Sequence, residues 1–511
     1  MSGAAQHYGL SAARRSLVHF MLGRGGSALA GIAVLMLLVR VMPAAEYGAL
    51  VAWLAFLEIH YLASGVGLSG IAQRYVPEFR TRAHPADLLR LVRQALQLRL
   101  LVTLLLSAAA GLAAVPLARA IGAVVPAPVG GLPFGVLLGV LLCTGTLMRY
   151  LDELLAALMQ QGVSQALALL RNLGKLPWLL LALWSHQAVP AVEMLWLESA
   201  LAGLSAVVSL RAVWRCVQVP GGADAAPAQP AYRADGMWGV SLRFYVIQVL
   251  GQVYGPNTLK LLVTRSLGVE ATAAFGFALA LADMLRNYLP AHLLAGWIRP
   301  LLVARYVATR SVDQLARLVG LVLKVNLLGV LAFALLFGVA GDAAGAWLSG
   351  GRFPALGLLL TALMLVVGLQ TAHLLLTMVT LTLERANANL LATVLACVGL
   401  PAAAALGVAF GLVGVALGLV IAEIVWIGTV WAGLWRGRVR LALHWPGLLR
   451  MGLAALPALA LALLVARGLG PWLGAVSGVL LFLAGQWLAR PLSDDEREVI
   501  AKFVPRRWIL W

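Results

Sequence analysis

The chain has 511 residues, of which 62% are hydrophobic and 11% are charged, and its formal net charge is +18. Soluble domains are about 45–50% apolar and about 25% charged. A soluble fold of this length needs more charged surface than the chain can supply, so a large soluble protein is excluded on composition.

Apolar runs of about 20 residues recur along the whole chain. Such a run is long enough to cross a hydrocarbon core of about 30 Å as a helix. The sequence therefore predicts an all-α, polytopic membrane protein with about fourteen transmembrane helices. The predicted spans are 17–39, 47–70, 98–118, 132–156, 164–184, 191–213, 239–263, 271–295, 319–341, 355–381, 388–408, 411–433, 450–467 and 471–489.

Breaks or bends are expected at three places inside or between these spans. The stretch "GQVYGPNTLK" at 251–260 contains Pro256, which removes a backbone donor and predicts a kink in the seventh span. The eleventh and twelfth spans are separated only by "AFG" at 409–411. The first span contains "GRGG" at 23–26, and a bendable helix is expected there as well.

Basic residues gather in alternate loops. Because cytoplasmic loops accumulate Lys and Arg, this pattern predicts that both termini are cytoplasmic. Basic residues beside apolar spans also favour anionic membrane lipids as partners over nucleic acid. The predicted cytoplasmic loops contain Arg74, Arg80, Arg82, Arg90, Arg93, Arg299, Arg305, Arg310, Arg317, Arg436, Arg438 and Arg440, and the opposite loops contain one arginine each, at Arg40, Arg119, Arg265, Arg352 and Arg467.

Motifs for soluble chemistry are missing from the sequence. Cys143, Cys216 and Cys397 are isolated and have no metal-ligand spacing. No Walker A, H-E-x-x-H or G-x-S-x-G pattern occurs, and the first apolar run indicates a retained span and not a cleaved signal peptide. The sequence thus predicts no enzymatic activity, no cofactor and no metal.

Charged residues inside the predicted spans are the candidate functional residues. A charge that faces lipid at a helix centre costs roughly 2.5–3.5 kcal/mol on insertion scales. These side chains are therefore expected to pair in the interior, to line water, or to snorkel near helix ends. The cations are Arg24, Arg149, Arg171, Lys175, Arg286 and Lys324, and the anions are Glu58, Asp152, Glu153, Glu198, Asp283 and Glu423.

Spacing divides the cations into two groups. Arg149 with Glu153 (i,i+4) and Asp283 with Arg286 (i,i+3) can each form an ion pair on one helix face. Arg171 and Lys175 are also i,i+4 but carry like charges. Either a bound phosphate or acids on another helix could compensate them.

The remaining charges leave similar alternatives. Arg24 lies beside three glycines and is expected to face a lumen, whereas Lys324 either lines that lumen or snorkels. The mid-span acids Glu58, Asp283 and Glu423 could carry a coupling proton or cation, or could be structural.

An internal repeat accompanies the split at the polar linker 216–238. The segment "LMLLVRVMPAAEYG" at 35–48 is similar to "KLLVTRSLGVEATAAFG" at 260–276. Parallel repeats are typical of transporters. The predicted domains are an N-lobe at 1–215, the cytoplasmic linker at 216–238, a C-lobe at 239–440, and an extra helix pair with a cytoplasmic tail at 441–511.

The stretches "VRVMPAAEYGAL" (39–50) and "GLSGIAQRYVPEFR" (67–80) resemble the N-terminal signature of Wzx-type polysaccharide flippases of the multidrug/oligosaccharidyl-lipid/polysaccharide (MOP) exporter superfamily. The resemblance implies two six-helix lobes around a central cavity. It also implies export of undecaprenyl-diphosphate-linked oligosaccharide repeats across the bacterial inner membrane, with a polymerase and other assembly proteins as partners. The alternatives are a drug or lipid II exporter of the same superfamily, and a membrane-embedded ligase or glycosyltransferase.

These observations lead to one hypothesis about the site. Arg24, Arg171, Lys175 and Arg286 are expected to face a shared, water-filled, cationic lumen that receives the substrate diphosphate, with Arg149 and Lys324 as further candidates. The helix pair at 450–489 contains no charge at mid-span and is expected to pack outside the repeated core.

Overall fold

The computed structural model describes the backbone of residues 10–82, 84–125, 132–218, 236–295 and 309–501, with single residues at 298, 302 and 306. Side chains are described in the same ranges, apart from 10–24, 81–82, 386 and 499–501. Every regular element within these ranges is a helix. The all-α fold class is therefore confirmed.

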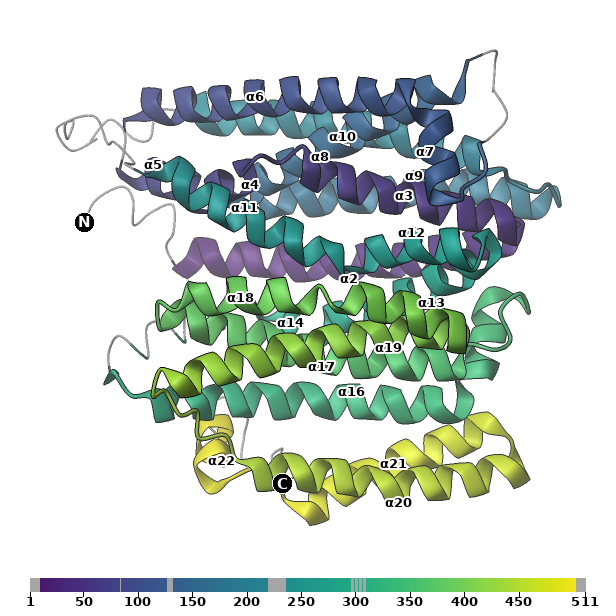
Figure 1. Cartoon of the computed structure of the whole chain (residues 1–511), viewed down its shortest axis with the longest axis vertical. Coiled ribbons are helices and arrows are strands. Elements are labelled where there is room, and N and C mark those ends of the chain that lie inside the picture. Colours follow the sequence, from purple (N-terminus) through teal and green to yellow (C-terminus); the bar gives the residue numbers. More distant parts are fainter. Residues whose placement is uncertain are drawn as a thin grey trace. The chain divides into compact units, whose positions relative to one another are not determined.

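The chain divides into two compact units (Figure 1). Unit 1 comprises Met1–Gln252 and Lys260–Ala273, and unit 2 comprises Val253–Leu259 and Ala274–Trp511. The boundary thus passes through the helices that follow the linker 216–238. The four predicted domains, which divide the chain at that linker, remain a prediction.

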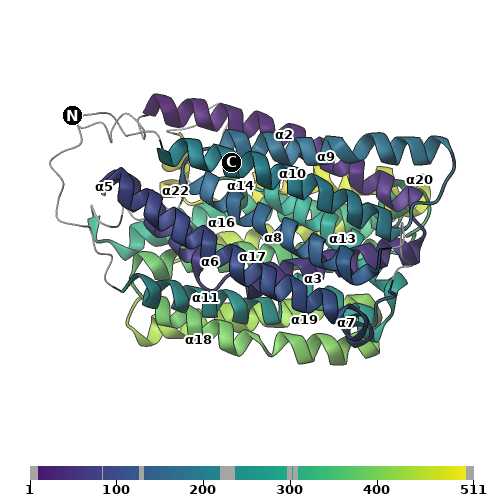
Figure 2. The ribbon, with the colours of Figure 1, turned by 90° about the horizontal axis from the view of Figure 1, so that it is seen from above.

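Long helices run side by side in unit 1 (Figures 1 and 2), where α8 contacts α6, α9 and α10, and α9 also contacts α2. Apolar side chains from the bent second span, α6, α8 and α10 form a buried core, which includes Leu68, Val92 and Leu154. The helices are α2 (Leu10–Val41), α3 (Ala44–Ala63), α4 (Leu68–Gly70), the π-helix η1 (Ile71–Tyr75), α5 (Val76–Arg82), α6 (Pro85–Leu112), α7 (Ala114–Ile121), α8 (Phe134–Ala157), α9 (Gln161–Trp184), α10 (Ala191–Gln218), α11 (Met237–Val253) and α12 (Pro256–Ser266), of which α12 continues from unit 2 into unit 1.

The second predicted span bends sharply within the stretch that carries the flippase resemblance. The helical segments Ala44–Ala63 and Leu68–Arg80 meet at 73°. Gly67 has φ +79°, a conformation that glycine adopts without strain. A Cβ atom there would lie 3.1 Å from the backbone of Ser241 on α11, so the bend is also a point of close helix packing.

Unit 2 is built around α16 and α17. The C-terminal helices α20 and α21 pack against each other and against α16, with Leu335, Ala458 and Phe482 buried between them. The helices are α13 (Val269–Tyr288, which begins in unit 1), α14 (Pro290–Leu293), α16 (Val312–Ser349), α17 (Gly357–Thr382), α18 (Ala386–Ala396), α19 (Gly399–Arg436), α20 (Trp445–Leu469), α21 (Pro471–Ala489) and α22 (Asp494–Ala501).

Helices occupy all fourteen predicted spans. Within the described residues, nine helices are long and apolar enough to cross a membrane by length and composition, or ten if the bent pair is one span. The predicted kink at Pro256 is confirmed, because α11 ends at Val253 and α12 begins at Pro256. The break near "AFG" is confirmed by a non-helical Gly411, whereas α2 runs unbroken through "GRGG".

Candidate functional site

Three ion pairs join four neighbouring helices of unit 1. Arg149 on α8 pairs with Glu58 on α3, and Lys175 on α9 pairs with Glu198 on α10. Between them, Arg171 on α9 lies 3.5 Å from Asp152 on α8. We call these six residues, Glu58, Arg149, Asp152, Arg171, Lys175 and Glu198, the charge ladder.

The side chains of the charge ladder are partly accessible. Their exposed fractions range from 11% for Lys175 to 37% for Glu58. All six residues belong to helices of the predicted spans, where contact with lipid is costly for a charge. The charge ladder therefore marks a face of unit 1 that is suited to water or to a polar ligand.

The central pair of the charge ladder has spare hydrogen-bonding capacity. Within the described residues, Nη1 of Arg171 and Oδ1 of Asp152 are buried and have no hydrogen-bond partner. The remaining contact, from Nη2 of Arg171 to Oδ2 of Asp152, is long for a charge-assisted hydrogen bond. The pair of Arg171 and Asp152 is therefore less completely hydrogen-bonded than the pairs on either side, and 17% of the Arg171 side chain is exposed.

One predicted pair of this region is wrong, and one alternative is decided. Glu153 is not the partner of Arg149, which pairs with Glu58 and donates to the carbonyl oxygen of Gly145 over 3.1 Å. Arg171 and Lys175 have no compensating charge on their own helix, but acids on α8 and α10 supply it. Sequence spacing finds partners on one helix only, so these cross-helix pairs could not be identified.

A buried arginine lies close to the bend and was not among the residues predicted from the sequence. Arg99 on α6 is 0% exposed. Its guanidinium lies 4.7 Å from the ring centre of Tyr61 and 5.4 Å from that of Tyr150, and Nη2 donates to the carbonyl oxygen of Tyr61 over 2.8 Å. Glu153 also lies near this arginine. The position of Arg99 at the first turn of the predicted span 98–118 indicates nothing more than a helix end.

In unit 2, the predicted pair of Asp283 and Arg286 is confirmed. The two side chains lie 3.0 Å apart on α13, and Arg286 also donates to Oε1 of Gln370 on α17 over 2.8 Å. Glu423 on α19 lies 2.8 Å from Nδ1 of His373 on α17. The predicted coupling acids Glu58, Asp283 and Glu423 thus each have a basic neighbour, and their coupling role remains a prediction.

Lys324 on α16 is neither a snorkelling residue nor exposed to a lumen. Its side chain is 1% exposed and lies 2.7 Å from Oε2 of Glu496 on α22. Nδ1 of His444, just before α20, is 3.0 Å away on the same ammonium group. Burial leaves no surface of Lys324 for a substrate, and the partner acid lies in a segment that the sequence indicates as a cytoplasmic tail.

The shared cationic lumen remains a prediction. The side chain of Arg24 lies outside the described residues. Arg171 and Lys175 have no partner on their own helix, as expected, and acids on neighbouring helices compensate their charge, although both stay partly accessible. Within the described residues, no group of three or more His, Cys, Asp or Glu side chains could hold a metal ion.

Solved structures of other proteins share this arrangement of helices, although sequence comparisons find no relative. No protein-family model and no curated protein sequence matches the chain. Among solved structures, the lipid II flippase MurJ in an inward closed conformation matches with a TM-score of 0.65 and 11% identity, over 94% of this chain and 100% of that one.

Multidrug transporters of the MATE family match as well. An inward-facing multidrug resistance MATE transporter of the MOP superfamily matches with a TM-score of 0.57 and 17% identity, over 81% of this chain and 94% of that one. A MATE structure in the bent conformation matches with a TM-score of 0.51 and 16% identity, over 86% and 98%. The chain therefore has the fold of these MOP-superfamily transporters.

Proposed function

We propose that the protein is a transporter that moves polyprenyl-diphosphate-linked oligosaccharides from the cytoplasmic to the periplasmic face of a bacterial inner membrane. It carries out no covalent chemistry. The exported repeats would supply polysaccharide assembly, with a polymerase among the proteins that act next.

The observation that carries this proposal is the extent of the structural match. A lipid II flippase covers 94% of the chain, whereas the two MATE transporters cover 81% and 86%. The cargo of a flippase is a lipid with a polar head group, and a lipid-linked oligosaccharide belongs to that class. The stretches at 39–50 and 67–80, which resemble Wzx-type flippases, also support such a cargo.

The charge ladder provides a physical route for a diphosphate. A multiply charged anion cannot enter hydrocarbon, so its path must offer compensating groups. Arg171 is 17% exposed, and its guanidinium can donate to a phosphate oxygen once the Nη1 group, which is buried and unpartnered in the described residues, turns toward the ligand. Asp152 then competes with the phosphate for the same guanidinium, which keeps binding weak enough for release.

Three other functions predict different experimental outcomes. Export of an organic drug requires no phosphate recognition, so it would not depend on the charge of Arg171. Export of lipid II by this chain would share the diphosphate requirement and would differ in the sugar. A ligase or glycosyltransferase needs a catalytic acid or base. In the described residues, each acid of the charge ladder forms an ion pair with a basic side chain.

The test is a flipping assay in vesicles with purified protein. A fluorescent polyprenyl-diphosphate oligosaccharide is placed in both leaflets, and the fraction accessible to an added glycosidase is followed over time. We expect the protein to make the inner-leaflet pool accessible to the glycosidase, and we expect the sugar lipid to stay chemically intact in parallel vesicles without glycosidase. Transport of a cationic dye without movement of the sugar lipid would favour drug export, and a transferred or ligated sugar would favour an enzyme.

A further inference from the structure

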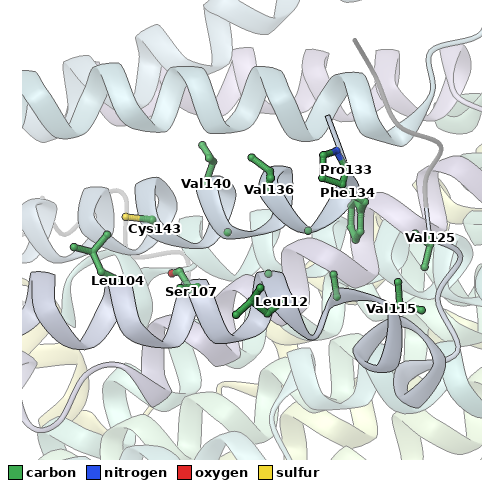
Figure 3. Close-up of a pocket in the computed structure, with 15 residues that line it drawn as sticks. Leu104, Ser107, Leu112, Val115, Val125, Pro133, Phe134, Val136, Val140 and Cys143 are labelled. Carbon is green, nitrogen blue, oxygen red and sulfur yellow. The ribbon is translucent and has the colours of Figure 1, made fainter. Parts of the chain in front are cut away.

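An apolar groove runs along unit 1 between α6 and α8 (Figure 3). It has a volume of about 1070 Å³ and is lined by fifteen residues of α6, α7, the segment after α7 and the start of α8. Leu104 and Cys143 lie at one end, and Val115, Val125 and Phe134 lie at the other. The groove is separate from the charge ladder, none of whose members line it.

Small residues create this groove. At the crossing of α6 and α8, a Cβ atom on Gly111 would lie 2.6 Å from the carbonyl oxygen of Gly135, so the two backbones touch. Gly139, one turn further along α8, leaves open space where a larger side chain would fill the groove. The floor of the groove is therefore formed by backbone and small side chains.

The lining favours hydrocarbon over a polar ligand. Ser107 is the lining residue with a hydroxyl group, and its Oγ atom is 3.3 Å from Nε2 of His60 in the interior. Around the groove, Leu104 and Leu112 on α6 and Val136 on α8 are 45% to 91% exposed, as is typical of side chains that face lipid. Helices α6 and α8 are both long and apolar enough to span a membrane, so a groove between them faces the acyl chains of the surrounding lipid.

The length of the groove fits one leaflet. The part of α6 from Leu104 to Leu112 rises by roughly 12 Å at about 1.5 Å per residue. The hydrocarbon of one leaflet is about 15 Å deep, half of the bilayer core. An unbranched acyl chain can follow this path.

A cation lies next to the α7 end of the groove. Helix α7 runs across the direction of α6 in Figure 1 and is viewed along its axis in Figure 2. Ala114 and Ala118 are its buried residues, and Ala114 and Val115 line the groove. Arg119, one turn after Val115 on the same face, is exposed. Arg119 has no ion pair with any residue that the structure describes.

We propose that this groove binds one acyl chain of an anionic glycerophospholipid, with the phosphate group of that lipid at Arg119. The apolar strip accepts the chain, and the arginine at its end selects for negative charge. The bound lipid lies over the close contact of Gly111 with Gly135 and fills the space beside Gly139.

The test uses photoactivatable lipids with the purified protein in vesicles of phosphatidylcholine. Phosphatidylglycerol with a diazirine on its acyl chain should label residues 104–115 and 133–143 more strongly than it labels the lipid-facing residues of α21. Phosphatidylcholine with the same chain should label the groove about fivefold less, because a basic residue near the surface contributes about 1 kcal/mol toward an anionic lipid. Arg119→Gln should remove this difference between the two lipids.

A matched pair of glycine variants tests the groove itself. A Cβ on Gly139 meets only an oxygen of Ser107 at 3.5 Å, and a Cβ on Gly203 of α10 meets only a methyl group of Thr144 at 3.5 Å. Gly139→Leu should reduce groove labelling to the level of α21, and Gly203→Leu should not. If Gly139→Leu does not elute as a folded protein, Ala108→Leu fills the same groove from α6.

Three results would overturn the proposal. Equal labelling of the groove and α21 would mean that the groove has no resident lipid. Preferential labelling by a diazirine polyprenyl phosphate, with displacement of phosphatidylglycerol, would assign the groove to a prenyl chain. A dimer in native mass spectrometry that Gly139→Leu dissociates would assign it to a second copy of the protein.

Discussion

The ammonium group of Lys324 on α16 lies 2.7 Å from the carboxylate of Glu496 on α22, and their side chains are only 1% and 3% exposed. Glu496 also accepts a hydrogen bond of 2.8 Å from the backbone amide of Ser493 at the start of α22. The C-terminal helix α22 is thereby attached to α16 by a fully desolvated pair. Breaking one half of such a pair leaves a buried charge without compensation.

We predict that Glu496→Gln lowers the free energy of unfolding by about 3–5 kcal/mol, since it strands the buried charge of Lys324. Replacing both partners, as Lys324→Met with Glu496→Leu, should recover most of this loss. Thermal unfolding in detergent, followed by intrinsic fluorescence, measures both changes.

The neighbouring pair of Arg317 and Asp495 is the control. These side chains also join α16 to α22, at 2.6 Å, but they are 47% and 63% exposed. Arg317→Gln should therefore cost no more than about 1 kcal/mol. If Arg317→Gln and Glu496→Gln shift the unfolding temperature equally, burial is not what gives the Lys324 pair its importance.

The glycine at position 48 lies where α3 meets the start of α13. A Cβ atom on Gly48 would overlap the carbonyl oxygen of Val269, so Gly48→Ala requires the two backbones to separate. We expect a loss of stability of about 1–3 kcal/mol, as for overpacking in a close-packed core. Gly25→Ala on α2, with nothing within 4 Å of the added Cβ, should be neutral or stabilising. Comparable unfolding temperatures for the two variants would contradict this packing.

Arg99 should require its planar guanidinium. The contacts with the rings of Tyr61 and Tyr150 and with the carbonyl oxygen of Tyr61 use both the charge and the flat shape of the group. We predict that Arg99→Lys lowers the unfolding temperature, whereas Arg90→Lys on the exposed face of the same helix does not. An unchanged unfolding temperature for Arg99→Lys would show that a positive charge alone is sufficient.

Orientation in the membrane is a separate prediction from the arginine pattern. Alkaline phosphatase fused after residue 85 should be inactive, because the loop at 72–95 is predicted to be cytoplasmic. A fusion after residue 125, in the predicted opposite loop, should be active. The reverse pair of activities would invert the topology and the direction of transport that we propose.

Much of the fold follows from the sequence because apolar run length depends on local composition. The helices form at every predicted span, and the interruptions at Pro256 and Gly411 lie where the residues predict them. The bend of the second span could not be foreseen, since its position depends on how Gly67 packs against Ser241. Likewise, the predicted span 98–118 contains the end of α6 and most of α7, because the residues on both sides of the break at Ala113 are apolar.

The candidate site was harder to predict because ion pairs between helices depend on tertiary packing. The pair of Asp283 and Arg286 was accessible to spacing rules, since both residues share one helix face. The partners of Arg149, Arg171, Lys175 and Lys324 lie 19 to 172 positions away in the sequence and on other helices, where spacing carries no information. All six members of the charge ladder were nevertheless among the candidates, because each is a charged residue inside a predicted span.

The charge ladder makes a prediction about transport. Exchanging the central pair, as Asp152→Arg with Arg171→Asp, preserves the net charge and the possible ion pair. If Arg171 contacts the cargo, the exchange should restore folding lost in Arg171→Asp but should not restore flipping. Recovery of flipping by the exchange would mean that the pair is structural.

The most direct test of the proposed function is the flipping rate of a polyprenyl-diphosphate oligosaccharide in vesicles that contain the purified wild-type protein or Arg171→Gln. We predict that the wild type transfers the lipid between leaflets and that Arg171→Gln, with an unchanged unfolding temperature, transfers it at least about tenfold more slowly, the rate equivalent of one charge-assisted hydrogen bond. Wild-type vesicles in which the sugar lipid stays in its leaflet, or equal rates for the two proteins, would contradict the proposed cargo or the role of the charge ladder, respectively.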